Sequence, residues 1–328
     1  MKKRLFVASL CLASAGWAIE LSPASLSAET PILVQPSGIS AAPAAANSKY
    51  PQVELLNPGA EPRQQLRLKP DINVKQTTVI TIKMDMKISA SGRPSPVSKI
   101  PVSAITFETT VTKIDPNGDI HYEFVYTNAD IAANNGNSPP AALDAMRSAL
   151  KKIVGLKGSF IMDNRGFHKG GNFILPEGTD ESLKQMVGQM SKSLEQFSSP
   201  LPAEAVGKGA KWRVSYSSNL NGINVNNIAT YELANWQDGI VSLNTNIDQQ
   251  ANPQGFNSPQ LPAGSTVNLK SLVSQGRGKV TGRLDRLIPS ISTVSISSNA
   301  VMSAKNSGSH EELIIITKMS MEMNLESK

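Results

Sequence analysis

The sequence contains few of the residues on which metal binding, nucleophilic catalysis and sugar stacking depend. It has 1 cysteine, 3 histidines and 5% aromatic residues in a chain of 328. Cys11 lies in an apolar run near the N-terminus, so no thiol is left after residue 28 to form a disulfide, a thiolate metal site or a nucleophile. The histidines, at positions 121, 168 and 310, are far apart and form no His-Glu-x-x-His pattern. The scarcity of aromatic residues argues against a surface that stacks carbohydrates.

The sequence also lacks catalytic motifs and a strongly basic region. It has no Gly-x-Ser-x-Gly elbow and no Ser-x-x-Lys with its partner motifs. The formal net charge is +6, and the basic residues are scattered except for Arg147, Lys151 and Lys152. Because nucleic-acid binding requires a clustered basic surface, we expect no nucleic-acid partner. We predict a non-enzymatic protein without a cofactor or metal; the enzymatic alternative is a hydrolase that uses Asp or Glu.

The first 28 residues have the organisation of a secretory signal peptide. Residues 1–4 are a short basic start, residues 5–19 are apolar, and residues 20–28 are polar and end in a small residue. The apolar run is shorter than the roughly 20 residues that span a membrane as a helix. We expect cleavage after Ala28, with cleavage after Ala18 as the alternative. An exported chain without disulfides is typical of bacteria, so we predict a location in the periplasm or outside the cell.

Composition divides the rest of the chain into a tether and a single domain. Residues 29–56 are rich in Pro, Ala and Ser without sustained periodicity, so they bury too little apolar surface to offset the entropy of ordering. We expect this tether to be disordered and the folded domain to extend over residues 57–328. No second apolar run approaches the length of a membrane span, so we expect no transmembrane segment after the signal peptide.

Apolar and polar residues alternate along much of the domain, which predicts β-strands with one buried face. The alternating segments lie at residues 79–88, 120–126, 212–216, 241–247, 294–302 and 313–325. In the last of them one face holds Leu313, Ile315, Met319, Met321, Met323 and Leu325, and the other holds Lys318, Ser320, Glu322 and Asn324. One-sided burial favours antiparallel pairing, because parallel sheets are usually covered on both faces.

Two segments have the periodicity of amphipathic helices. The first begins at Ser138-Pro139-Pro140, and the second begins at Thr179-Asp180-Glu181 and stops before Pro200. Their apolar stripes are Leu143, Met146, Leu150 and Ile153 in the first, and Leu183, Met186, Val187, Met190, Leu194 and Phe197 in the second. We therefore predict a mainly β (α+β) fold: a large curved antiparallel sheet or half-barrel with two amphipathic helices packed on it.

The domain shows signs of an internal duplication, with related halves at about residues 57–200 and 201–328. Three features recur at a nearly constant offset: Asn117-Gly118 with Asp238-Gly239, Ser138-Pro139 with Ser258-Pro259, and Gly158 with Gly278. Each half is consistent with a lead-in strand, a hairpin, a Ser-Pro crossover and a strand that starts with Gly. The alternative is chance, since Gly and Ser-Pro are common in β proteins.

Two short motifs have both a chemical and a structural interpretation. Asp115, Asn117 and Asp119 have the spacing of the first ligands of a calcium loop, but Ile120 stands where such a loop needs Gly, which favours a hairpin turn. Residues 276–282 are similar to a phosphate-binding loop, but the spacing is wrong and no helix is expected to follow. We expect these glycines to allow the strand to bend or a neighbouring backbone to approach.

Methionines recur on the apolar faces of the predicted strands and helices. Because Met is flexible and polarizable, it suits surfaces that adapt to varied apolar partners. The functional interpretation is a groove for acyl chains between the sheet and the helices, and the structural interpretation is a core that uses Met as a filler. The candidate lining residues are Met84, Met86, Met146, Met186, Met190, Met319, Met321 and Met323.

Three short motifs carry a resemblance to known proteins. They are a Gly-x-x-Trp strand entry at residues 209–212, a Thr-Tyr-x-Leu strand at residues 230–233 and a late Gly-x-Gly strand at residues 276–278. The chain resembles, over roughly residues 66–325, an uncharacterised family of exported bacterial β-rich proteins. The resemblance implies export and a β-rich fold, and no activity. In architecture alone, the expected fold is similar to envelope lipid carriers, in which helices close a curved antiparallel sheet.

These observations predict an exported, non-enzymatic envelope protein that binds a lipid or another apolar or amphipathic ligand between sheet and helices. The alternative is a structural or protein-interaction module with a filled core and an envelope protein as its partner. The tether, the duplicated sheet and the Asn/Ser-rich stretches at residues 134–137 and 219–227, which we expect to be loops, motivate that alternative.

Overall fold

The computed structural model describes residues 51–328 apart from residues 95, 134–137, 176, 180, 182, 185–186, 189–199, 221, 257–265 and 306–311. The predicted signal peptide and most of the predicted tether therefore lie outside the described residues. Within the part of the chain that is described, no helix has the length and hydropathy of a membrane span.

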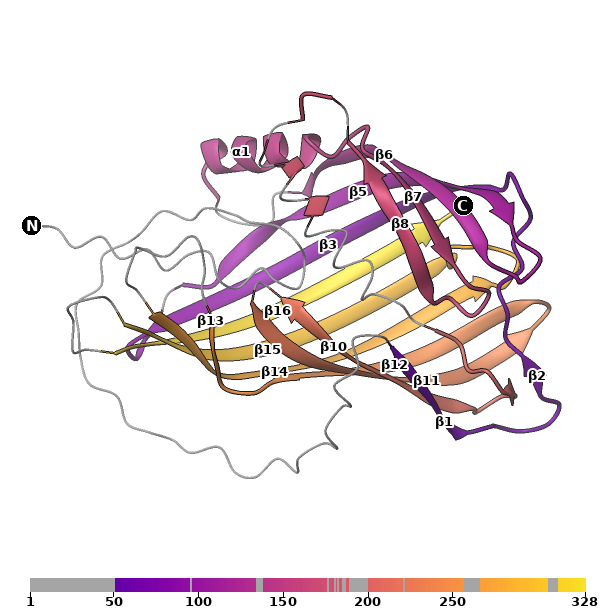
Figure 1. The fold of residues 1–328 in the computed structure, drawn as a ribbon. Coiled ribbons are helices and arrows are strands. Elements are labelled where there is room, and N and C mark those ends of the chain that lie inside the picture. The colour runs from indigo at the N-terminus through magenta and orange to yellow at the C-terminus, as the bar shows by residue number, and fades with distance from the viewer. Residues whose placement is uncertain are drawn as a thin grey trace, which may run out of the picture.

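The described chain is mostly β-strand, with one complete helix (Figure 1). Up to residue 174 the elements are β1 (Gln52–Asn57), β2 (Gln64–Gln65), β3 (Lys75–Ala90), β4 (Arg93–Pro94), β5 (Ser98–Ile114), β6 (Ile120–Ala133), α1 (Pro140–Lys151), β7 (Lys157–Met162) and β8 (His168–Ile174). From residue 205 they are β9 (Ala205–Val206), β10 (Lys211–Leu220), β11 (Ile223–Gln237), β12 (Ile240–Ala251), β13 (Gln254–Phe256), β14 (Thr266–Arg283), β15 (Ile291–Lys305) and β16 (Leu313–Ser327).

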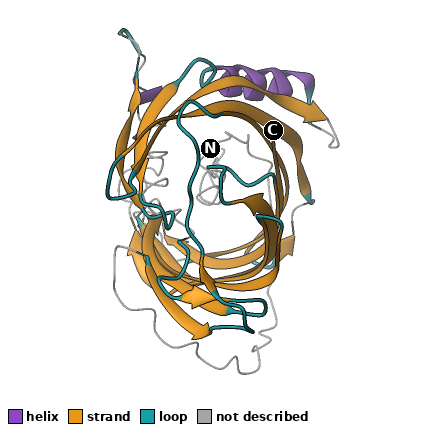
Figure 2. Ribbon diagram, turned by 90° about the vertical axis from the view of Figure 1, so that its right-hand side faces the viewer, coloured by secondary structure: helices purple, strands orange, loops and turns teal. Residues whose placement is uncertain are grey.

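A single 14-stranded antiparallel sheet dominates the molecule. Its order is β1-β10-β11-β12-β14-β15-β16-β3-β5-β6-β7-β8, with β13 paired to β14 and β4 paired to β3. The path ends at β1 and β8, so the sheet is not closed, and its strands curl round a common axis (Figure 2). β2 and β9 form a separate two-stranded sheet. The predicted large curved antiparallel sheet is confirmed.

The two predicted halves of the domain occupy consecutive parts of the sheet. The strands β3, β5, β6, β7 and β8 follow one another on one side, and β10 to β12 and β14 to β16 follow one another on the other. The two blocks meet where β16 pairs with β3, a pairing that we call the seam. Its register sets Met321 opposite Met84 and Met319 opposite Met86. The duplication itself stays a prediction.

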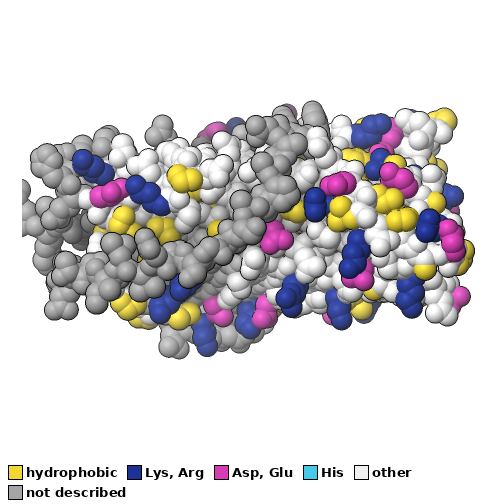
Figure 3. Space-filling model, turned by 90° about the horizontal axis from the view of Figure 1, so that it is seen from below, with side chains coloured by type: hydrophobic (Ala, Val, Ile, Leu, Met, Phe, Trp, Pro, Cys, Tyr) yellow, Lys and Arg dark blue, Asp and Glu magenta, His cyan; other side chains and the backbone are white. Residues whose placement is uncertain are grey.

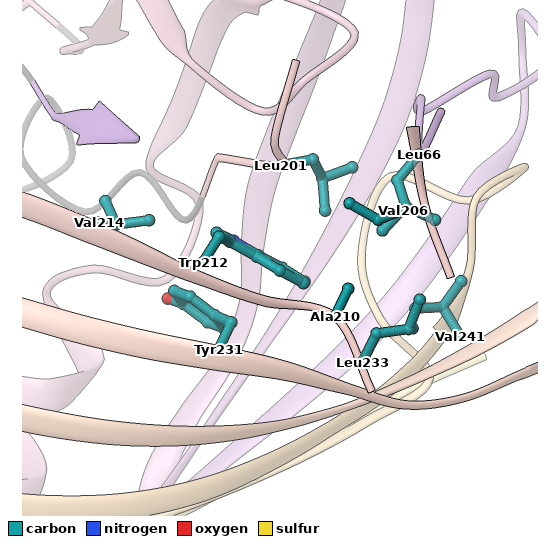
Figure 4. Close-up of a cluster of buried hydrophobic side chains, with 9 residues drawn as sticks. All are labelled: Leu66, Leu201, Val206, Ala210, Trp212, Val214, Tyr231, Leu233 and Val241. Atoms are coloured by element: carbon teal, nitrogen blue, oxygen red, sulfur yellow. The ribbon is translucent and has the colours of Figure 1, made fainter. Parts of the chain in front are cut away.

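Alternation gives the sheet a buried inner face and an exposed outer face. In β16, Met319 and Met321 are buried, whereas Lys318, Ser320 and Glu322 between and beside them are exposed. Strand pairing continues the inner face from β16 round to β10, where the side chain of Trp212 projects into the space that the sheet encloses (Figure 4). The predicted faces of the last strand are confirmed.

Glycines on the inner face of β14 allow the sheet to curl. A Cβ atom added at Gly276 would lie 2.8 Å from Ile296 and 2.9 Å from the Ser295 carbonyl oxygen. One added at Gly278 would lie 2.8 Å both from Thr245 and from a backbone carbonyl oxygen of β15. Only glycine fits so close an approach of neighbouring strands. The predicted close approach of a neighbouring backbone is confirmed, and these residues belong to β14 rather than to a loop before a helix.

The described residues contain one complete helix, where the sequence predicted two. α1 has proline in its first turn, and its Leu150 packs with Ile153 against Ile105 of β5 and Ala129 of β6. The second predicted helix falls on residues 179–197, most of which lie outside the described residues, as do the side chains of two of its methionines, Met186 and Met190.

Two segments predicted to be irregular are strands. β1 begins at Gln52, within the predicted tether, because Val53 and Leu55 alternate with polar residues and pack against the core beside β10. The Asn/Ser-rich stretch 219–227 lies in the β10–β11 hairpin, where Asn219 pairs with Asn224. Cross-strand amide hydrogen bonds suit these residues to a strand there, including one of 2.8 Å from Asn219 Nδ2 to Asn224 Oδ1. Residues 134–137 lie outside the described residues.

Candidate ligand-binding face

The inner face at the seam is a cluster of methionines. Met84 of β3 and Met319 and Met321 of β16 are buried, with exposed fractions of 4%, 8% and 8%. The partly buried apolar residues that pack against them are Ile82, Ile100 and Ile296, from β3, β5 and β15. Every member of this set belongs to the sheet itself. We call Met84, Met86, Met319, Met321 and Met323, with these three isoleucines, the methionine face.

Five of the eight methionines predicted to line a ligand site come together on this face. Met86 is buried opposite Met319, and Met323 is half-buried opposite Ile82. Met146 does not join them, because it lies on α1 and packs against the cluster of Ile105, Ala129 and Leu150. The remaining two, Met186 and Met190, have side chains outside the described residues.

A ladder of buried and half-buried polar side chains crosses the inner face beside the methionines. Asn227 donates through Nδ2 to the Ser218 hydroxyl at 2.9 Å and accepts at Oδ1 from Gln249 Nε2 at 2.9 Å. On the next pair of strands, Ser298 donates to Ser274 at 2.8 Å. The register places this ladder in line with Met319 and Met86. Sequence reasoning missed it, although Asn227 falls at an inward position of an alternating strand.

Charge is confined to the outer face of the central strands. Among the described residues of β3, β10, β11, β12, β14, β15 and β16, the inward positions in register with the methionine face hold no Asp, Glu, Lys or Arg. On the outer face Lys83 lies 3.3 Å from Glu322, directly behind Met84 and Met321. Figure 3 shows basic and acidic side chains scattered over the underside of the sheet. The outer face is therefore suited to contact with water, and the inner face is suited to contact with uncharged groups.

One end of the enclosed space is filled by apolar side chains from outside the sheet. Leu66, Leu201 and Val206 pack against Trp212 and Leu233 on the inner face of β10 and β11 (Figure 4). We call this cluster the plug. The Trp212 ring stacks on that of Tyr231 with centroids 5.5 Å apart. Beside it, burial raises the pKa of Tyr216 to about 12.

A buried glutamine ties the β14–β15 connection to β3 near the plug. The Gln76 Oε1 atom accepts from the backbone N–H groups of Leu287 and Ile288 at 2.9 and 3.0 Å. Its Nε2 atom donates to the Ile288 carbonyl at 3.0 Å and to Ser327 Oγ at 3.2 Å. All four hydrogen-bonding positions of this amide are therefore in use.

Aromatic rings line the inner face near the β8 edge. Phe160 stacks on Phe124 at 5.5 Å and meets Phe173 edge-on at 5.5 Å. Gly158 makes room for them, since a Cβ there would lie 2.5 Å from the Phe160 ring and 2.6 Å from that of Phe124. Burial raises the pKa of Tyr122 and of Tyr126 on β6 to about 12.

The turn between β5 and β6 is the predicted hairpin turn, and it is closed by two Lys–Asp ion pairs and a His–Asp hydrogen bond. Asp115 lies 2.6 Å from Lys113 and 2.7 Å from His121, and Asp119 lies 2.6 Å from Lys169. Hydrogen bonds from Lys113 and His121 lower the pKa of Asp115, and that from Lys169 lowers the pKa of Asp119. A general acid requires the opposite shift.

His121 on β6 and His168 on β8 lie two strands apart in the sheet, on either side of β7. His168 packs against Phe160 with ring centroids 5.5 Å apart, and His310 lies outside the described residues. Across the described part of the chain, no group of three or more His, Cys, Asp or Glu side chains is arranged to hold a metal ion.

Comparison with known proteins places part of the chain in context. Residues 176–286, 111 of the 328, match the model of a "Family of unknown function (DUF6263)". This match covers Trp212, Tyr231, Gly276 and Gly278, whose motifs predicted a resemblance to an uncharacterised family, and confirms that resemblance there. No curated protein matches the chain.

Two solved structures align with most of the chain. A mutant of Rh. blastica porin is 11% identical, with 75% of this chain and 99% of that one covered and a TM-score of 0.15. A structure described as "Asymmetric conductivity of engineered proteins" is 10% identical, with the same coverage and TM-score. A TM-score of 0.15 carries no argument about the fold.

Proposed function

We propose that the protein is an exported, non-enzymatic envelope protein that binds an apolar or amphipathic ligand along its methionine face. The observation that carries the proposal is the division of the central strands into a charged outer face and an uncharged, methionine-rich inner face. The signal-like N-terminus supports export to the periplasm or the cell exterior of a bacterium.

Methionine is informative at this position because of its shape. An unbranched thioether side chain adapts to apolar partners of different outline, whereas β-branched side chains present one rigid surface. The two directly paired sets, Met84 with Met321 and Met86 with Met319, place four such side chains together at the seam. A ligand that varies in chain length or saturation would find an adaptable surface there.

The alternative function, a scaffold with a filled interior that binds an envelope protein, draws support from the plug. There, Leu66, Val206 and Leu233 are fully buried, and the side chains come from three separate parts of the chain. If other side chains of the protein covered the methionine face as they cover the plug, the only role of the inner face would be to stabilise the fold.

Native mass spectrometry tests the two functions directly. The full-length chain is expressed, allowed to be exported and purified without detergent. A bound species of a few hundred daltons or more that extracts into organic solvent is the expected result. A mass equal to that of the polypeptide, together with no uptake of added lipids, would overturn ligand binding and favour the scaffold.

Substitutions on the two faces of β16 provide a matched pair. We expect Met321→Phe and Met84→Phe to abolish ligand uptake while the protein remains folded, because the added bulk occupies ligand space. Ser320→Phe, on the exposed outer face beside Met321, is the control and should leave uptake unchanged. A loss of about 1–3 kcal/mol in unfolding free energy for the inner variants would instead indicate an overpacked core.

A further inference from the structure

We infer that the ligand carries an uncharged polar end group, such as an alcohol or ester, and that this group lies over β10–β12 while the apolar part lies over the methionine face. The inference rests on the proposed function and specifies the class of ligand and its direction in the site.

The first observation is a pair of buried polar atoms without partners. Among the described residues, Trp212 Nε1 on β10 and Thr245 Oγ1 on β12 have no hydrogen-bond partner, although the residues are only 1% and 6% exposed. Both lie on the inner face, in register with Tyr231 on the strand between them, and Thr245, unlike Trp212, is not a member of the plug. A buried donor without a partner is costly, and a ligand oxygen that accepts from it removes that cost.

The second observation is that polar groups gather on the same strands. The ladder of Asn227, Gln249 and Ser218 begins there, and the Tyr216 ring borders it in register with Asn227. The hydroxyls, the indole N–H and the amides in this region can donate to or accept from a ligand hydroxyl or carbonyl. None of them carries a charge at neutral pH.

The third observation concerns charge. No inward position of the described central strands that is in register with these donors or with the methionine face offers a cation or a carboxylate to neutralise an ionised end group. Burying an ion without a partner is much more costly than burying a hydroxyl or an ester. A free fatty acid, ionised at neutral pH, is therefore a poor match, and an uncharged amphiphile is a good one.

The register of the paired strands gives the direction in which the ligand would lie. The row that holds Thr245 continues through Gly278 and Val294 to Met323 on β16. With neighbouring strands about 4.8 Å apart, roughly 14 Å of sheet separates Thr245 from the methionine face. Gly278 has no side chain and so adds no bulk to that row. An acyl or alkyl chain anchored at β12 would therefore run towards the seam.

Three probes with the same chain and different end groups test the inference. Binding of 1-hexadecanol, hexadecanoate and hexadecylammonium to the full-length, exported and delipidated protein is compared at pH 7.5 by native mass spectrometry. We expect the alcohol to bind at least tenfold more tightly than either ion. Equal or tighter binding of an ion would overturn the inference but leave the proposed function standing. Absence of binding by all three, and by any co-purified lipid, would overturn the proposed function itself.

A nearly isosteric substitution tests the position of the end group. Thr245→Val removes the unpartnered hydroxyl and keeps the shape, so the protein should remain folded and be at least as stable without ligand. We expect hexadecanol affinity to fall severalfold, as for the loss of one neutral hydrogen bond, and hexadecane affinity to stay unchanged. Thr293→Val, on the exposed outer face of β15, is the matched control. Unchanged hexadecanol affinity in Thr245→Val would place the end group elsewhere and overturn the assignment.

Discussion

The plug and the methionine face are built from the same sheet but are completed in different ways. At the plug, the inner face of β10 and β11 is covered by Leu66, Leu201 and Val206, which come from outside the 14-stranded sheet. At the seam, the apolar residues of the described chain that pack against the buried methionines all belong to strands of the sheet. The buried side chains of the plug are mainly aromatic or branched, whereas the buried side chains of the methionine cluster at the seam are flexible methionines. This difference supports the proposal that the plug stabilises the fold and that the methionine face receives a ligand.

The two regions should differ most in the unfolding free energy that is lost when a buried side chain is truncated to alanine. Trp212→Ala should lower the unfolding free energy by about 3–5 kcal/mol, because it empties a filled core. In delipidated protein the proposed function predicts a loss of less than about 2 kcal/mol for Met321→Ala, because the ligand would supply part of the packing around that side chain. Urea unfolding of both variants measures the difference. Equal losses would mean that the seam is filled core like the plug.

Loss of the buried amide near the plug should have the next largest effect. Gln76→Leu leaves the N–H groups of Leu287 and Ile288 without acceptors, at about 1–3 kcal/mol for each buried group. We expect the unfolding free energy to fall by at least about 2 kcal/mol and ligand uptake by the folded fraction to persist. Thr77→Val, on the outer face next to it, is the control for urea unfolding. An unchanged unfolding free energy in Gln76→Leu would show that these hydrogen bonds do not stabilise the region near the plug.

Alkaline pH should lower the unfolding free energy, because three tyrosines are buried in the folded protein. Tyr122, Tyr126 and Tyr216 have pKa values raised to about 12 by burial, against about 10 in an unfolded chain. Their contribution to stability is complete below pH 10 and is lost as pH rises from 10 to 12, because the unfolded state releases its protons first.

Each tyrosine should contribute a slope of about 1.4 kcal/mol per pH unit in that range. Urea unfolding at several pH values between 9 and 11.5 measures the slope, which Tyr126→Phe and Tyr216→Phe should each reduce by roughly a third. A variant that leaves the slope unchanged would identify a tyrosine that is hydrated in the folded protein.

The smallest effect is expected on the outer face of the seam. Lys83 and Glu322 form an exposed pair at 3.3 Å, and such pairs contribute about 0–1 kcal/mol. Lys83→Gln should change the unfolding free energy by less than about 0.5 kcal/mol and leave ligand uptake unchanged. A clear loss of uptake in this variant would show that the outer face takes part in binding, against the division between the two faces.

Much of the strand pattern and part of the candidate site could be predicted from the sequence. Alternation identified the faces of β16, and it placed Met84, Met86, Met319, Met321 and Met323 on a common buried side. Period-two patterning is a local property, so it is readable without knowing the strand order. That Met146 packs with a different cluster could not be predicted, because a helical stripe does not indicate which cluster it meets.

The rest depends on contacts between distant segments. Nothing local indicates that β16 pairs with β3, or that Leu66 covers Trp212, since those contacts join parts of the chain more than a hundred residues apart. The strand β1 was assigned to a tether because six residues give too short a pattern beside a Pro/Ala/Ser-rich segment. The polar ladder was overlooked because Asn-rich stretches favour turns, a preference that pairing across a hairpin overrides.

The seam also determines when the molecule can finish folding. β16 is the last strand of the sheet in chain order, yet it lies between β15 and β3, in the interior of the strand order. Until it arrives, both neighbours keep an unpaired edge, and the apolar residues of β3 lack their cross-strand partners. Pairing between strands so far apart in the sequence is slow. Until it occurs, the unpaired edges can form hydrogen bonds with other chains. The period in which the folding chain is most open to misassembly therefore ends only when that final strand is in place.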